Sequence, residues 1–303
     1  MELSVLVMQM LILFFLILCG YISGRSGLLK KEDIPLLSKI VLNIGIPGVV
    51  LSSVGGGCQL TVSEVFLCLT GFFAFSILCA LFAKATVKLL GIKADKRLYE
   101  FMYMFSNVGF VGLPVVQAVL GEKVLVYALL FLIPNNLLLF SYGEYLMRDT
   151  KGFSLRSFLN PPVIASILAV GICLFDICFP YPVAKSISYM GNITTPLAMI
   201  ITGISLNGVP VKEMGKNKEL RLFLAVKMLL LPLVGYAVLR ILRVPNMMVN
   251  ILILMMAMPI PSNTVIYASI YQKNVSLASQ ASVLTSLVCV VTIPIVFSLI
   301  SLL

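Results

Sequence analysis

The chain has 303 residues, of which 60% are hydrophobic and only 11% carry a charge. Soluble domains average roughly 25% charged residues, so this composition excludes a soluble globular protein and indicates an integral membrane protein. The net charge of +10 does not indicate nucleic-acid binding. Most of the lysines and arginines lie in short loops between apolar stretches, where basic residues mark the cytoplasmic side of a membrane. We therefore expect the lipid bilayer, and no nucleic acid, as a partner.

Apolar stretches of about 20 residues, each enough to cross a hydrocarbon core of about 30 Å, follow one another along the chain. The first has the length of a secretion signal, but no basic residue precedes it, so we interpret it as a membrane helix. The sequence predicts an all-α protein with ten transmembrane helices, at residues 4–24, 34–55, 62–89, 99–120, 123–147, 161–180, 185–207, 219–241, 246–271 and 275–301.

The basic residues predict the orientation of these helices. Sixteen lysines and arginines fall in loops and helix ends that would share one side of the membrane, and four fall on the other: Lys123, Lys185, Arg240 and Arg243. Because basic residues are in excess on the cytoplasmic side, we expect a multi-pass protein of the plasma membrane with both termini outside.

Proline positions predict that the two halves of the chain are related. Pro47 and Pro196 are 149 residues apart, and Pro114 and Pro261 are 147 residues apart. An odd number of helices in each half would insert the second half upside down relative to the first. We therefore predict a 5+5 inverted repeat, with residues 1–148 and 149–303 as its halves.

The fourth predicted helix is interrupted by the stretch SNVGFVGLPVV, residues 106–116. It holds a polar amide at Asn107, permissive glycines at Gly109 and Gly112, and a helix-breaking proline at Pro114. Non-helical backbone at membrane depth is tolerated only where protein or a water-filled cavity surrounds it. We therefore expect a discontinuous helix here.

A matching interruption lies in the ninth predicted helix, in the stretch MAMPIPSNT. Its candidate residues are Pro259, Pro261, Ser262, Asn263 and Thr264. Paired interruptions in two halves are the best sequence pointer to a transporter site. The amino-terminal ends of half-helices carry about +0.5 of a charge, so two of them meeting near the bilayer midplane, with helices 4 and 9 crossing there, favour an anion.

Other polar residues inside the predicted helices are weaker candidates. Asn135 and Asn136 follow Pro134 in helix five, where they either face the cavity or join neighbouring helices. Glu64 and Glu144 are possible carriers of a coupling proton, because an intramembrane carboxylate is expensive unless it serves a role. The remaining candidates are Asn43, Ser188, Thr194 and Thr195.

Together the stretches FSNVGFVGLPVVQAVLGE, PNN, AMPIPSNTVIYASIY and LNIGIPG resemble the auxin efflux carrier family over essentially the whole chain. The resemblance implies a scaffold of helices 1, 2, 6 and 7, a moving transport domain of helices 3–5 and 8–10, and a homodimer. It also implies an organic-anion site at the crossover of helices 4 and 9. Residues of helices two and five would complete that pocket, here near Asn43, Pro47 and Asn135 or Asn136.

Family members carry malonate, malate and other carboxylates as well as auxin. The connection 148–160 is short here, so the long cytoplasmic loop of many plant members is missing, which favours a compact prokaryotic carrier. We predict a secondary transporter that moves a small organic carboxylate by alternating access. Which carboxylate, in which direction and with what coupling stay open at this point.

Three other function classes are alternatives to a carboxylate carrier. A sodium symporter of the bile-acid carrier type would need clustered carboxylate and carbonyl oxygens near the midplane, and an intramembrane sensor or channel would also use helix ends that face a cavity. An enzyme is not expected, because the chain has no histidine and no paired midplane carboxylates.

We expect no cofactor and no metal. The seven cysteines lack metal-ligand spacing, and a bridge between Cys58 and Cys178 is left open.

Overall fold

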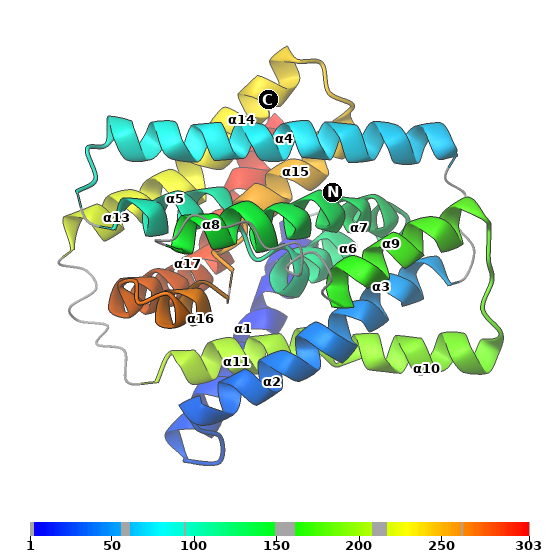
Figure 1. The fold of residues 1–303 in the computed structure, drawn as a ribbon, viewed down its shortest axis with the longest axis horizontal. Helices are drawn as coiled ribbons and strands as arrows, with labels where there is room; N and C mark the ends of the chain where they lie inside the picture. The colour runs from blue at the N-terminus through cyan, green and yellow to red at the C-terminus, as the bar shows by residue number, and fades with distance from the viewer. Residues whose placement is uncertain are drawn as a thin grey trace.

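The computed structural model describes residues 3–55, 61–93, 95–148, 161–207, 217–261 and 263–302, and in these ranges all regular structure is helical (Figure 1). In the first half the helices are α1 (Leu3–Arg25), the 3-10 turn η1 (Lys31–Asp33), α2 (Ile34–Ile40), η2 (Val41–Gly45), α3 (Ile46–Val54), α4 (Val62–Leu89), α5 (Lys96–Met104), η3 (Val108–Gly112), α6 (Leu113–Leu120), α7 (Glu122–Leu138), η4 (Leu139–Gly143) and α8 (Glu144–Met147). In the second half they are α9 (Pro161–Leu174), α10 (Tyr181–Asn192), α11 (Thr194–Ser205), α13 (Lys218–Ala225), η6 (Val226–Leu230), α14 (Leu231–Ile241), α15 (Asn246–Ala257), α16 (Asn263–Ile270) and α17 (Val275–Leu302).

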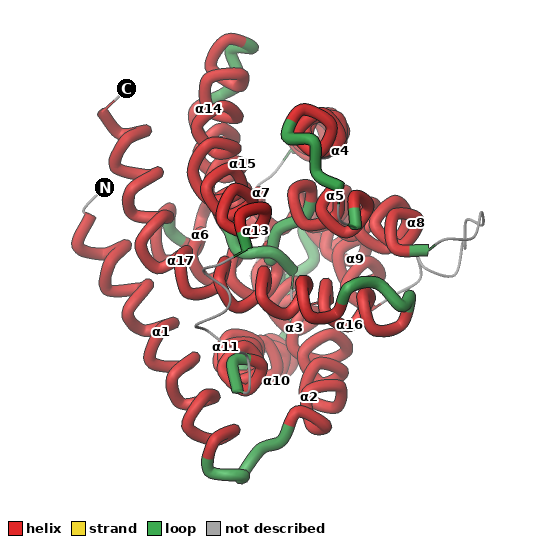
Figure 2. The backbone as a smooth tube through the Cα atoms, turned by 90° about the vertical axis from the view of Figure 1, so that its left-hand side faces the viewer, coloured by secondary structure: helices red, strands yellow, loops and turns green. Residues whose placement is uncertain are grey.

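Helix is found in each of the ten predicted ranges. Five continuous stretches within the described residues are long and apolar enough to cross a membrane: Lys31–Ser52, Val62–Leu89, Tyr181–Ser205, Lys218–Ile241 and Val275–Leu299. The protein is therefore a multi-pass membrane protein. The count of ten crossings, the inverted repeat and the crossing of helices 4 and 9 stay predictions. The start of α1 and the end of α17 lie toward the same end of the molecule (Figure 2).

Prolines explain where several helices widen. The π-turns η2, η3 and η6 each come directly before a helix whose second residue is proline: Pro47, Pro114 or Pro232. A proline has no N–H to donate and its ring clashes with the carbonyl four residues earlier. One extra residue in the preceding turn relieves that clash while the chain stays helical.

The two broken segments lie in the middle of the molecule. Their first halves, α5 and α15, bury six of nine and nine of twelve residues, including Tyr99, Phe101, Ile251 and Met255. The prediction of discontinuous helices is confirmed locally, because regular hydrogen bonding ends at Met104 and again at Ala257 and resumes only at Val108 and Asn263. Unpaired backbone groups are therefore held inside protein rather than against lipid.

Several pairs of helices pack closely. α1 runs along α11, and α3 packs against α9 and α10. α4 packs against α5 and α7, α14 against α15, and α16 against α17, while α7 also contacts α9 and α1 also contacts α17. The division into a scaffold and a transport domain stays a prediction.

Glycines allow the closest of these contacts. A Cβ atom on Gly203 of α11 would overlap the carbonyl oxygen of Ile17 and lie 2.6 Å from the amide nitrogen of Tyr21. On the facing helix, a Cβ on Gly20 would overlap the carbonyl oxygen of Ile200. Membrane helices associate through such small-residue surfaces because no hydrophobic effect drives them together in lipid.

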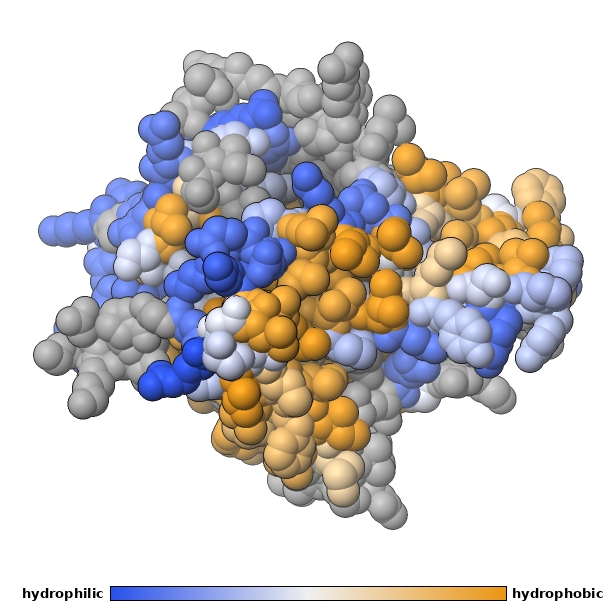
Figure 3. Space-filling model, turned by 90° about the horizontal axis from the view of Figure 1, so that it is seen from below, coloured by the Kyte–Doolittle hydropathy of each residue, from blue (hydrophilic) through white to orange (hydrophobic). Residues whose placement is uncertain are grey.

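Large apolar side chains are exposed over much of the outer surface. Phe66, Leu81, Leu89, Phe175 and Ile241 are among those that face outward. Figure 3 shows hydrophobic residues gathered in broad patches, with hydrophilic residues beside and between them. A soluble protein rarely exposes large contiguous apolar patches, so we interpret these surfaces as lipid-facing.

One sequence-based suggestion is wrong. Cys178 is a free thiol, so it forms no bridge with Cys58, and the disulfide-bonded cysteine is Cys173 instead. Cys58 itself lies outside the described residues.

Candidate functional site

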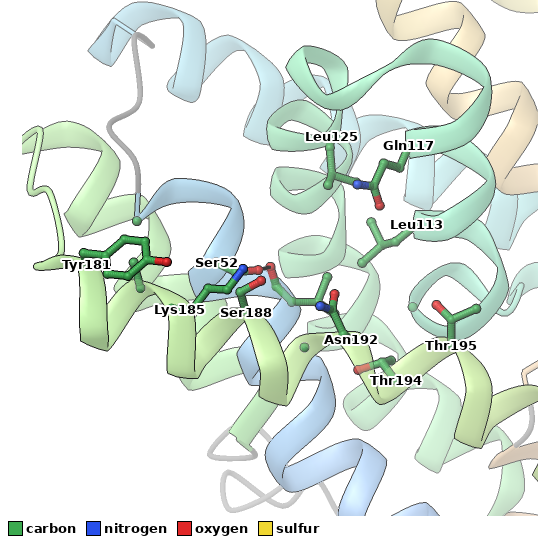
Figure 4. Close-up of a pocket in the computed structure, with 15 residues that line it drawn as sticks. Ser52, Leu113, Gln117, Leu125, Tyr181, Lys185, Ser188, Asn192, Thr194 and Thr195 are labelled. Carbon is green, nitrogen blue, oxygen red and sulfur yellow. Dashed lines mark hydrogen bonds between the residues drawn. The ribbon is translucent and has the colours of Figure 1, made fainter.

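A polar cavity of about 570 Å³ lies between α3, α6, α10 and α11. Figure 4 shows the labelled polar side chains that line it. They comprise one cation, four hydroxyls from tyrosine, serine and threonine of α10 and α11, a serine of α3 and two amides: Lys185, Tyr181, Ser188, Thr194, Thr195, Ser52, Gln117 and Asn192. A volume of this size is typical of small-molecule sites.

Helix periodicity explains how the polar wall forms. Tyr181, Ala184, Lys185, Ser188 and Gly191 all line the cavity, and their spacing of three and four residues places them on one face of α10. On the opposite wall the lining residues are Gly109, Leu113 and Gln117, which recur every four residues along η3 and α6. One wall therefore comes from the first broken segment.

Close backbone contact sets the floor of the cavity. A Cβ on Gly48 would lie 2.6 Å from the amide nitrogen of Gly191, and a Cβ on Gly45 would lie 2.5 Å from the Thr194 hydroxyl. The second membrane segment can therefore cross the end of α10 and the start of α11 this closely only because both positions are glycine.

The Thr194 side chain is 2% exposed, yet its hydroxyl has no hydrogen-bond partner among the described residues. Buried hydroxyls without a partner are uncommon and call for an explanation, such as a water or a ligand. Since Thr194 lines the cavity, it offers a ready donor or acceptor there.

The charge in the cavity is positive. Lys185 is exposed, and its ammonium lies 5.1 Å from the centre of the Tyr189 ring. The lining residues that the structure describes include no aspartate or glutamate. A water-accessible cleft with charge of one sign attracts ligands of the opposite sign.

Of the candidate residues in the first broken segment, some line the large cavity and others are buried outside it. Gly109 lines the cavity, whereas Asn107 is buried and its backbone N–H donates to the carbonyl oxygen of Pro259 at 2.7 Å. This bond joins the two broken segments directly. Gly112 faces Met255, where a Cβ would lie 2.7 Å from the sulfur, and Pro114 is near the start of α6.

In the second broken segment, the turn that follows Pro261 is held by a local hydrogen bond. The Thr264 hydroxyl is fully buried and donates to the carbonyl oxygen of Pro261 at 2.6 Å. Asn263 begins α16, but its side chain and the whole of Ser262 lie outside the described residues.

The asparagines of the second and fifth predicted helices differ in environment. Asn135 and Asn136 are buried in α7, and Asn135 lines a separate cavity of about 20 Å³ together with Ser106. The exposed amide of Asn43 donates to the Lys39 carbonyl in its own helix at 2.7 Å, and Pro47 begins the next helix. The fold thus does not gather these amides in the large cavity.

Glu64 and Glu144 both have structural partners. Glu64 caps α4, where it accepts a hydrogen bond from the backbone N–H of Thr61 at 2.8 Å. Glu144 forms an ion pair with Arg148 and accepts a hydrogen bond from the Tyr271 hydroxyl at 2.7 Å, which ties α8 to the end of α16. Their role in proton coupling stays a prediction.

Sequence reasoning missed Gln117, Lys185 and Asn192 as cavity residues. The distribution of basic residues predicts only that Lys185 lies on the outer side of the membrane. The spacing of Tyr181, Lys185 and Ser188 could have indicated a polar helix face, but not the helix opposite to it. Among the described residues, no three histidine, cysteine, aspartate or glutamate side chains lie close enough together to hold a metal ion.

Comparisons with known proteins point in one direction. The family model of membrane transport proteins matches residues 5–153 and 150–297. An uncharacterized transporter of Methanocaldococcus jannaschii is 25% identical, covering 91% of this chain and 92% of its own length. A Rhizobium meliloti protein provisionally named a malonate transporter is 21% identical over 92% of this chain and 91% of its own. An uncharacterized transporter of Escherichia coli strain K12 is 23% identical over 74% of this chain and 76% of its own.

Proposed function

Since the chain belongs to the membrane transport protein family, as its resemblance to auxin efflux carriers predicted, we propose that it is a secondary carrier of a small organic carboxylate. The cavity between α3, α6, α10 and α11 is the outer part of its substrate path. Asn107, Asn135, Asn136, Asn263 and the backbone of the two broken segments form the inner part.

The observation that supports an anion best is the presence of Lys185 among neutral donors, without an acidic residue in the described lining. A carboxylate only accepts hydrogen bonds, and its bonds to charged donors are about twice as strong as neutral ones. Lys185 therefore attracts the substrate, while the hydroxyls of Ser188, Thr194 and Thr195 orient it. One exposed cation binds modestly, which suits a carrier that must also release.

Alternating access follows from which helices form the two walls. One wall is α3, α10 and α11 of the expected scaffold, and the other is α6 of the expected transport domain. Sliding or rocking of one against the other would expose the site to each side in turn. A homodimer held by the scaffold, in the plasma membrane and with both termini outside, belongs to the same proposal.

The test is charge movement in proteoliposomes on a solid-supported membrane, with malonate, malate, lactate and indole-acetate added in turn, at two pH values and with or without sodium. Malonate comes first because of the Rhizobium relative. We expect a current, or radiolabelled counterflow if transport is electroneutral, that saturates with one carboxylate. Current without saturation would indicate a channel, sodium dependence would indicate a symporter, and binding without movement would indicate a sensor.

Replacing Thr194 by valine should change the affinity for the substrate without lowering the stability of the protein. Valine keeps the shape and removes a hydroxyl that has no partner in the described structure, so we expect the melting temperature of the purified protein to stay constant or rise slightly. The apparent affinity for the carboxylate should fall about fivefold, in line with roughly 1 kcal/mol for a hydrogen bond. Unchanged affinity would place the substrate away from Thr194. Thr70→Val, on the exposed face of α4, is the matched control.

A further inference from the structure

A buried lysine stands outside the proposed substrate cavity. Lys227 lies in the π-turn η6, and its side chain is 1% exposed. Its ammonium donates to the carbonyl oxygens of Tyr103 and Phe105 at 3.0 and 3.1 Å and to the hydroxyl of Ser106 at 3.0 Å. A lysine ammonium has three N–H donors, so each of them has a partner.

All three acceptors lie at the end of the first half-helix: Tyr103 is in its last turn, and Phe105 and Ser106 follow it directly. α5 ends at Met104, and the last carbonyls of a helix have no partner within it. These carbonyls also carry the negative end of the helix dipole, equivalent to about −0.5 of a charge. Within the described part of the chain no carboxylate forms an ion pair with Lys227. The helix end is therefore the main counter-charge of this buried cation.

The same place joins the two broken segments. The Ser106 hydroxyl lies 3.5 Å from the carbonyl oxygen of Met256, and the next residue, Asn107, forms the backbone bond to Pro259. Lys227 thus holds α5 at the point where its chain leaves the helix and meets the second segment.

A cluster of carbonyl and hydroxyl oxygens at the end of a broken helix is also how transporters coordinate a coupling cation such as sodium. We propose that the Lys227 ammonium is a tethered cation that permanently occupies this position, so that the carrier holds its broken helix in place without sodium. This rests on the proposed function as a secondary carrier. Lys227 is then a positioning residue, which acts through α5 and the backbone at Asn107 rather than on the substrate.

Truncation of the lysine provides the test. Lys227→Ala would leave the oxygens of Tyr103, Phe105 and Ser106 around an empty space. We expect the melting temperature of the purified variant to fall by several degrees in choline chloride. Either sodium chloride or methylammonium chloride at the same ionic strength should restore at least half of that loss. The wild-type protein should melt at the same temperature in all three salts.

The control is Lys88→Ala, at an exposed position in the last turn of α4, which should not gain a response to either cation. If Lys227→Ala cannot be purified, Ser106→Ala removes one ligand and keeps the ammonium, and it should lower the melting temperature less and remain insensitive to sodium. A wild-type melting temperature that rises with sodium, a Lys227→Ala variant that responds to neither cation, or a sodium response in Ser106→Ala would overturn the proposal.

No substrate takes part in these melting measurements. Failure of the carboxylate assay and failure of the tethered-cation proposal are therefore distinguishable. If both hold, Lys227→Ala proteoliposomes should show substrate currents only when sodium or methylammonium is present, whereas wild-type currents should ignore both. A purely structural lysine would not change the cation dependence of transport.

Discussion

Reversal of the charge at Lys185 is expected to abolish carboxylate currents at substrate concentrations that drive the wild-type protein. Lys185→Glu replaces the cation of the cavity lining by an anion, so the cleft would repel the substrate that it now attracts. A favourable field in a cleft raises association rates by about tenfold or more, and its reversal removes that gain and adds a barrier. The measurement is the concentration dependence of the peak current in proteoliposomes.

Two further variants make this result specific. Lys185→Arg keeps the charge and should retain saturable transport, with an apparent affinity close to that of the wild type. Lys88→Glu, at an exposed position on α4, changes the net charge equally and should have no such effect. If Lys185→Glu and the wild-type protein gave equal currents, the substrate would not pass through the large cavity. High salt should weaken the difference, because exposed charges are screened.

A second large effect is expected at Gly203, where α11 contacts α1. Gly203→Ala introduces a Cβ atom that overlaps the Ile17 carbonyl oxygen and lies 2.6 Å from the Tyr21 amide nitrogen. Both are backbone atoms, so the helices themselves must move apart. Overpacking of this kind costs about 1–3 kcal/mol, occasionally more. The melting temperature of the purified protein in detergent should therefore fall clearly.

Gly171→Ala is the matched control, since a Cβ there meets nothing within 4 Å. Alanine also favours helix over glycine by about 1 kcal/mol, so this variant should melt at the wild-type temperature or slightly above it. If Gly203→Ala melts like Gly171→Ala, the contact between α1 and α11 is looser than the structure shows.

Local features of the fold could be predicted from the sequence because they depend on local chemistry. The helix α4 begins and ends where its apolar run does, at Val62 and Leu89. The breaks near Asn107 and Pro259 follow from glycine and proline, which act on the backbone within a turn. The ten-span count and the repeat rest on longer patterns and stay predictions.

The arrangement of side chains between helices could not be predicted in the same way. Periodicity identifies a polar face on α10 but does not say that Gln117 of α6 lies across from it. The sequence does not indicate the partners of Lys227, because all three are more than 120 residues away along the chain. Gly20 and Gly24 did offer a signal, since glycines four residues apart on an apolar helix indicate a helix contact.

The hydrogen bond from the Asn107 N–H to the Pro259 carbonyl oxygen can be kept when side chains in the centre of the protein change. Both atoms belong to the main chain, so any residue except proline at position 107 could donate the same bond. Relatives that share only 21–25% of their residues with this chain could therefore keep the joint while the walls of the cavity diverge. If the proposed function holds, substitutions on α10 can then change which ligand is recognised, while the bond between the two broken segments stays the same.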